Sequence, residues 1–146
     1  MKKSIVMICS GILFLSSGVY ANMSVGGHPI DIQKQGKEIK VTGMNNTRTI
    51  KCTGDEIVSI EGASNKVTIL GSFAKLNVEG ASNNVKADNV AKIEVEGTQN
   101  MINVNQVDSV SVEGAHNHIH YKESANKSGK ADISIEGADN MVMKLK

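Results

Sequence analysis

The sequence repeats a short motif in which apolar and polar residues alternate and are followed by glycine and, three residues later, asparagine. The phrases are IKVTGMNN, VSIEGASN, LNVEGASN, IEVEGTQN, VSVEGAHN and ISIEGADN, and their glycines are Gly43, Gly62, Gly80, Gly97, Gly114 and Gly137. Successive glycines are separated by 19, 18, 17, 17 and 23 residues. A repeat of this length with alternating apolar positions indicates stacked strand units and not helices.

The alternation assigns side chains to the inside and the outside of such a stack. Two short strands around a Gly-x-x-Asn corner cannot bury a face alone, whereas units stacked in register enclose an aliphatic core. We therefore predict an all-β fold, a parallel β-solenoid similar to a β-helix, with about six rungs of 17–19 residues and two short strands in each. The predicted inward pairs before the glycine are Ile39/Val41, Val58/Ile60, Leu76/Val78, Ile93/Val95, Val110/Val112 and Ile133/Ile135, and those after it are Val67/Ile69, Val85/Ala87, Ile102/Val104 and Ile119/Tyr121.

Two other all-β arrangements fit part of this pattern. A left-handed helix of hexapeptides also has about 18 residues in each coil, but it needs an apolar residue every six positions. An antiparallel sandwich stays open as an alternative, because alternation alone does not fix the direction of the strands. The constant glycine and asparagine of the corner favour the two-faced solenoid.

The corner residues have a physical explanation. Glycine adopts a positive φ without a Cβ clash, and an asparagine three residues later can hydrogen-bond the backbone of the turn. In stacked parallel strands these asparagines would form an amide ladder with a spacing of about 4.8 Å. We therefore predict a structural role for Asn46, Asn65, Asn83, Asn100, Asn117 and Asn140.

A glutamate precedes the glycine in five of the units and is predicted to point outward. These residues, which we call the glutamate column, are Glu61, Glu79, Glu96, Glu113 and Glu136. Screening of their mutual repulsion by water and by nearby lysines is the favoured interpretation. Calcium binding is the alternative, although the sequence has no Asp-rich calcium nonapeptide.

Residues 1–21 have the features of a secretory signal peptide. Lys2 and Lys3 precede an apolar run over residues 5–15, and Val19 and Ala21 fit the positions before a cleavage site. The apolar run is short for an uncleaved anchor helix, which is the alternative. We expect an exported protein, periplasmic or secreted and without a membrane span after cleavage, with a capping or partly mobile segment over residues 22–38. The solenoid is predicted over residues 39–146, with a loop extension at 122–130.

Composition after residue 21 excludes several kinds of partner. The net charge falls from +1 to −1 when Lys2 and Lys3 are removed, and the other lysines are scattered, so no basic patch for nucleic acid remains. Phe73 and Tyr121 are the only aromatic residues left to stack on bases or sugars. Cys52 is then the only cysteine, so we expect a buried inert thiol, an intermolecular disulfide or a reactive group, in that order.

Three of the four histidines follow one another at alternate positions in VSVEGAHNHIHY. His118 and His120 are predicted to point outward from the same strand, with His116 on the corner beside them. The matching outward positions of the neighbouring units are occupied by methionines. Imidazole with thioether suits copper, and imidazole alone suits zinc or nickel. The candidate metal ligands are His118, His120, His116, Met101, Met141 and Met143.

Two features count against this metal site. Lys144 falls at an inward position, so a slip of one residue would turn Met141 and Met143 into the core. The loop at 122–129 could also cover the surface. The simpler interpretation is that the histidines face solvent and the methionines fill the core.

The tandem V-x-V-x-G-x-x-N-x-V-x-V units resemble the family called domain of unknown function 3060, which consists of short exported bacterial proteins. The resemblance extends from Ile39 to Val142 and rests on VEGASN, VEGTQN and VEGAHN. It implies a repeat fold but no activity and no catalytic residues. Some members have cysteines at the looser corners, where Cys52 stands here without a partner.

These observations favour a function without catalysis or a cofactor. Catalytic solenoids use long chains, large loops and clustered acids or a Ser/His/Asp set. This chain has short corners, and its only concentrated titratable groups are the glutamate column and the three histidines. We expect a structural or binding module of the bacterial envelope that presents flat faces to a protein, an envelope component or itself. Periplasmic binding of a copper-type metal ion through the histidines and methionines is the alternative.

Overall fold

The computed structural model describes residues 36–146, which contain nine strands and no helix. None of this part of the chain could therefore cross a membrane as a helix. The predicted signal peptide and residues 22–35 of the predicted capping segment lie outside the described residues. The strands are β1 (Glu38–Met44), β2 (Thr47–Thr53), β3 (Ile57–Ala63), β4 (Lys66–Ala81), β5 (Asn84–Thr98), β6 (Met101–Ala115), β7 (His118–Glu123), β8 (Asp132–Ala138) and β9 (Met141–Lys144).

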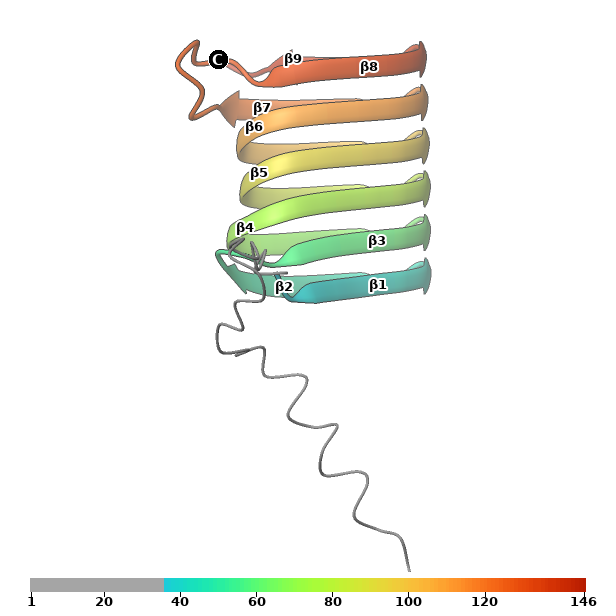
Figure 1. Ribbon diagram of the computed structural model, residues 1–146. Helices are drawn as coiled ribbons and strands as arrows, with labels where there is room; N and C mark the ends of the chain where they lie inside the picture. Colours follow the sequence, from blue (N-terminus) through green and yellow to red (C-terminus); the bar gives the residue numbers. More distant parts are fainter. Residues whose placement is uncertain (1–35) are drawn as a thin grey trace, which may run out of the picture. The chain divides into compact units, whose positions relative to one another are not determined.

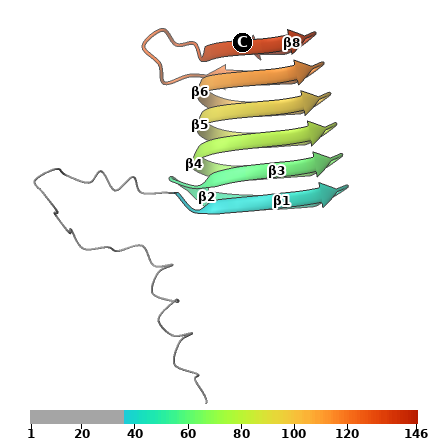
Figure 2. The same ribbon diagram turned by 45° about the vertical axis from the view of Figure 1, so that its right-hand side comes forward.

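The strands wind into a parallel β-solenoid. The segments before the corner glycines stack in the order β1, β3, the second parts of β4, β5 and β6, and then β8. The segments after the corner asparagines stack as β2, the first parts of β4, β5 and β6, then β7 and β9. Figures 1 and 2 show these rungs one above another, with the strands of each face running the same way. The predicted solenoid of about six rungs is confirmed, and the antiparallel sandwich is excluded.

The repeat glycines fix the register of the rungs. Gly43 pairs with Gly62, and the column continues through each later glycine to Gly137. The longest spacing is absorbed by the loop between β7 and β8, whose Ala125 N–H donates to the Asp108 carboxylate at 2.8 Å. This anchor holds the loop at the corner opposite the glycines, and Figure 1 shows it there.

The core of the middle rungs consists of the predicted inward residues. Ile60, Leu76, Ile93, Ile102 and Ile119 are fully buried. A further inward column, which the repeat pattern did not reveal, lies at the second corner and contains Phe73, Val90 and Val107. Stacking of the rungs therefore packs aliphatic side chains closely along the solenoid axis, which a single pair of strands cannot do.

The second corner differs from the sequence expectation of two separate strands in every rung. Strands β4, β5 and β6 continue through it and are 15 or 16 residues long. In β4 the bend is taken up by a register shift between Ile69 and Ser72, where Gly71 adopts a φ of 91°. A bulge bends a strand without ending it, so the sequence signal of a loose turn corresponds to a bent strand.

Cys52, the only cysteine within residues 36–146, is buried, and its thiol is free. Burial raises its pKa, and the nearby Glu56 carboxylate raises it further. The neutral thiol is therefore favoured, in agreement with the first of the three interpretations of this cysteine.

The last rung leaves part of the predicted core uncovered. Ile133 and Ile135 point inward as predicted, in register with Val110 and Val112, but each is 45% exposed. Among the described strands, β8 pairs with β6 alone, so no further rung covers these side chains. An alternating pattern shows which way a side chain points and not whether another layer of the core covers it.

Candidate functional site

The corner that presents the histidines contains two residues with a positive φ. The repeat glycines have φ between 102° and 127°. The residue before each asparagine also lies in the left-handed region, and His116 has a φ of 58°. The sequence analysis missed this second residue, because it varies in type from rung to rung. Its members are Asn45, Ser64, Ser82, Gln99, His116 and Asp139.

Successive corners are in direct contact. A Cβ placed on Gly114 would lie 2.0 Å from the Gly97 carbonyl oxygen, and one on Gly137 would lie 1.9 Å from that of Gly114. No side chain fits at these positions, so glycine is required both for its φ and for the close approach of the backbones. The corner therefore holds the residues after it at a fixed spacing.

The asparagines form the predicted ladder. In the rung of the histidines, the Asn117 side-chain nitrogen donates to the Gly97 carbonyl at 2.9 Å, and its oxygen accepts from the Asn100 backbone N–H at 3.0 Å. Asn65, Asn83, Asn100 and Asn117 are each no more than 1% exposed. The predicted structural role is confirmed, because these amides satisfy backbone groups that would otherwise be buried without partners.

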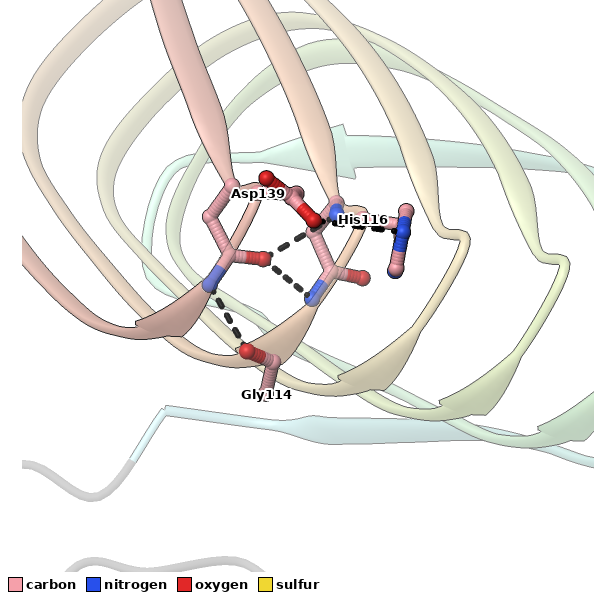
Figure 3. A network of polar contacts seen from close by, with 5 residues as sticks. Gly114, His116 and Asp139 are labelled. Carbon is pink, nitrogen blue, oxygen red and sulfur yellow. Dashed lines mark hydrogen bonds and ion pairs between the residues drawn. The ribbon is translucent and has the colours of Figure 1, made fainter.

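His116 directly precedes the ladder residue Asn117 on the corner. Its Nε2 is 3.5 Å from an oxygen of Asp139, the equivalent residue of the last rung. Figure 3 shows the two side chains on successive corners, above the contact made by Gly114. Both side chains are largely exposed, so this contact contributes little to stability.

His118 lies between two methionines. It pairs in register with Met101 on one side and with Met141 on the other, and each of the three is the first residue of its strand. Neighbouring parallel strands are about 4.8 Å apart, and residues paired in register point to the same face. The imidazole therefore stands between two thioethers on the outer surface. We call these residues, together with His116, His120 and Met143, the His/Met surface.

The second outward column contains His120. This residue pairs with Asn103 and with Met143, and its Nδ1 is 3.3 Å from the Asn103 side-chain oxygen. His118 and His120 are two positions apart along β7, which is about 6 to 7 Å in a strand. The methionine next to His120 thus extends the thioether surface along β9.

The two objections to the metal site are met by the register of the last strand and by the position of the loop. Lys144 pairs with Tyr121, so β9 has not slipped, and Met141 and Met143 point outward with exposed side chains. The loop after β7 lies at the opposite corner, where the Lys144 ammonium donates to the Gly129 carbonyl at 2.7 Å. It leaves the His/Met surface uncovered. A shallow depression of about 390 Å³ there is lined by Met101, His116 and His118 among others.

This arrangement suits a soft metal ion better than a hard one. Within residues 36–146, no three His, Cys, Asp or Glu side chains gather in a way that could hold a metal. A site on this surface would therefore depend on the methionine sulfurs. Thioether with imidazole is a ligand set that selects Cu(I), whereas carboxylate and carbonyl oxygens suit calcium or magnesium.

The repeats match a family described as "Protein of unknown function (DUF3060)" over residues 60–103 and 89–130. The chain belongs to the DUF3060 family. The DUF3060 match includes Met101 and the three histidines of the surface and ends before Met141 and Met143. No curated protein and no solved structure matches the chain significantly.

Charged groups of this DUF3060 chain form ion pairs both within a rung and between neighbouring rungs. Glu94 lies 2.6 Å from the Lys75 ammonium and 2.7 Å from that of Lys92, and these hydrogen bonds lower its pKa. The glutamate column stands in register as predicted, with Glu61 3.5 Å from Lys40 at its first rung. The predicted alternative of calcium binding has no converging set of acidic side chains among the described residues.

Glu56 is the one buried carboxylate at the second corner of the described rungs. It accepts hydrogen bonds from the Thr53 backbone and hydroxyl at 2.9 and 2.8 Å, and from the Gly54 N–H at 2.9 Å. These bonds, those from Thr53 above all, lower its pKa to about 2. The sequence showed no periodic signal for this residue, because the cap occurs in one rung and is not repeated.

Proposed function

We propose that this protein is an exported, non-enzymatic binding module of the bacterial envelope that holds a copper-type metal ion on its His/Met surface. Residues 1–21, with their basic start and short apolar run, support export. The exposed side chains of Met101 and Met141, in register on either side of His118, support a role in binding.

The observation that carries the proposal is the register of Met101, His118 and Met141 on three adjacent strands. Their Cα atoms repeat at the strand spacing of about 4.8 Å, so one methionine lies on each side of the imidazole, and the flexible thioether side chains can turn toward it. His120 and Met143 provide a second pair of the same types in the next outward column. This soft and borderline ligand set fits Cu(I), which binds with few ligands and favours thioethers.

The solenoid supports this function because it fixes the ligands before a metal arrives. The Asn117 and Asn140 side-chain amides donate to the Gly97 and Gly114 carbonyls, which lie in the corners before Met101 and His118. A rigid surface of this kind loses little conformational entropy on binding, which favours affinity. Side-chain rotations of the methionines would be the main adjustment.

Competition titration tests the proposal. The purified protein is titrated with Cu(I) under anaerobic conditions against a chromogenic chelator, and Zn(II) and Ni(II) are titrated separately. We expect stoichiometric Cu(I) binding, weaker by at least about tenfold in His118→Ala and in Met101→Ala, since each removes one ligand of a shared site. Met44→Ala is the matched control, because Met44 is an exposed methionine on the first rung.

Each outcome of this titration decides between the two candidate functions. Binding lost in the ligand variants and kept in Met44→Ala supports the metal function. Absence of Cu(I) binding, or binding unchanged in His118→Ala, contradicts it and leaves a structural module of the envelope as the function to pursue.

Export is tested separately by expression of the full chain in a bacterial host. Mass spectrometry of the protein from the periplasm and the medium should find an N-terminus near Asn22. Intact chain confined to the cytoplasm would contradict export without affecting the metal site.

A further inference from the structure

The last rung of the solenoid exposes its core and two strand edges. Strand β8 pairs with β6 alone and β9 with β7 alone, so the other edge of each carries unpaired backbone groups. The inward residues Ile133 and Ile135 are 45% exposed. Edge strands of natural proteins are commonly guarded by proline, a bulge or an inward charge. Strand β8, with the sequence DISIEGA, has none of these, whereas β9 carries Lys144 at an inward register position near its end.

The inward residues of the first rung are better covered by comparison. Val41 stands in the same core column as Ile135, since the register runs from one to the other through each intervening rung. Val41 is only 6% exposed, and Cys52 of the same rung is also buried. Strands β1 and β2 also have one neighbour each among the described strands, so the exposed core, and not the unpaired edges alone, distinguishes the last rung. Pairing of two last rungs covers exposed apolar side chains on both sides of the contact, whereas a head-to-tail stack covers them on one side only.

We propose that two copies of this chain pair through their last rungs about a two-fold axis, which goes beyond the proposed metal function and does not depend on it. Such a pairing joins β8 to β8 of the second copy, and β9 to its β9, as antiparallel edges. The unpaired backbone groups of both rungs are then satisfied, and the two cores become continuous.

The sequence of the last rung fits this symmetry. Ile135 lies two residues before Gly137, and Val142 lies two residues after Asn140, so both are equally far from the corner. An axis through these two inward positions places Ile135 against Ile135 and Val142 against Val142 of the second copy. Alternation then keeps inward residues opposite inward residues along both edges.

The outward pairs around this axis are free of direct charge repulsion. Glu136 stands opposite Ser134 of the second copy, and Asp132 stands opposite Ala138. On the other face, Met141 stands opposite Met143 of the second copy. Like charges directly opposed in an antiparallel pair are destabilising, and this register opposes none.

Light scattering after size exclusion, with the protein loaded at about 1 to 100 μM, tests the pairing in the range expected of a small interface. The wild-type protein should show twice the mass of one chain at the upper concentration and should dissociate on dilution. Ile135→Lys should have the mass of one chain throughout, because the axis brings two ammonium groups together. The rung already holds a lysine, Lys144, at an inward register position, so the variant should fold.

Controls make both results decisive. Circular dichroism should be unchanged in Ile135→Lys, and Ile133→Lys provides a second variant if that protein is lost. Met44→Lys changes an apolar residue that is 69% exposed on the first rung and should leave the dimer intact. A wild-type protein that is monomeric at 100 μM, a dimer that persists in both lysine variants, or growth into larger assemblies would overturn the proposal.

Discussion

The side-chain oxygen of Asn100 accepts a hydrogen bond from the backbone N–H of Asn83, one rung earlier, at 3.1 Å. The nitrogen of the same amide donates to the Gly80 carbonyl at 3.0 Å. One buried side chain thus satisfies two backbone groups of the preceding corner. The repeat can place a polar residue at a buried position in every rung because each amide is fully used by its neighbours.

Replacement of Asn100 by alanine should therefore be strongly destabilising. It leaves two buried backbone groups without partners, at a cost of about 1–3 kcal/mol each. Asn46→Ala is the matched control, because within the described residues the Asn46 side chain donates to the exposed Thr42 carbonyl of its own rung and to no preceding corner. Chemical denaturation should show a loss of about 2–6 kcal/mol for Asn100→Ala and below about 1.5 kcal/mol for Asn46→Ala. Equal losses would mean that the ladder does not support the corners.

Alanine substitutions at Gly80 and Gly43 separate the cost of backbone strain from the cost of a clash with the neighbouring rung. Both have a positive φ, so alanine at either position is strained by about 1–3 kcal/mol. A Cβ on Gly80 would also lie 2.0 Å from the Gly62 carbonyl oxygen, whereas one on Gly43 meets nothing closer than 3.3 Å. Gly80→Ala should therefore lower the free energy of unfolding by about 1–3 kcal/mol more than Gly43→Ala does. Similar values for the two variants would contradict the close stacking of corners.

A charge in the middle of the core should unfold the protein. Val95 is almost fully buried, and an unpaired aspartate there would cost several kcal/mol against a total stability of about 5–15 kcal/mol. Ile135→Asp occupies the same column at the open end and should keep a β-type circular dichroism spectrum. A folded Val95→Asp protein would refute the assignment of inward positions.

Glu56 should make stability depend on pH in the acid range. Its pKa of about 2 lies below the usual value of 4.5, so the folded state favours the charged carboxylate. This contribution is fully present above about pH 4.5 and is lost as the pH falls toward 2. Glu56→Gln should have a lower melting temperature than the wild-type protein at pH 7, and the difference should shrink between pH 4.5 and 2. A difference that is constant over this range would exclude the charge as its cause.

The sequence was sufficient for the architecture because one physical requirement recurs in every rung. Alternation gave the inward residues such as Ile60 and Ile93, and the spacing of Gly80 and Asn83 gave the corner. Features that occur once or vary in residue type were missed. Phe73 lies in an irregular segment, Glu56 caps a single bend, and the left-handed residue of the corner is His116 in one rung and Gln99 in the rung before.

The sequence was sufficient to place the histidines of the candidate site, but not its last two methionines. Histidines at alternate positions in a strand repeat must share a face, so His118 and His120 could be placed together from the sequence. Whether Met141 and Met143 belonged to that face depended on the register of β9, which the inward Lys144 left ambiguous. Pairing of Lys144 with Tyr121 settles the register, because a slip of one residue would reverse every side chain of the strand.

X-ray absorption spectroscopy at the copper edge would examine the proposed site itself. The wild-type protein is loaded with one equivalent of Cu(I) and compared with Met101→Ala and with Met44→Ala. We predict a first shell that contains both sulfur and nitrogen, with less sulfur in Met101→Ala and no change in Met44→Ala. A shell of nitrogen and oxygen alone, or one that is the same in all three proteins, would contradict a copper site between Met101, His118 and Met141.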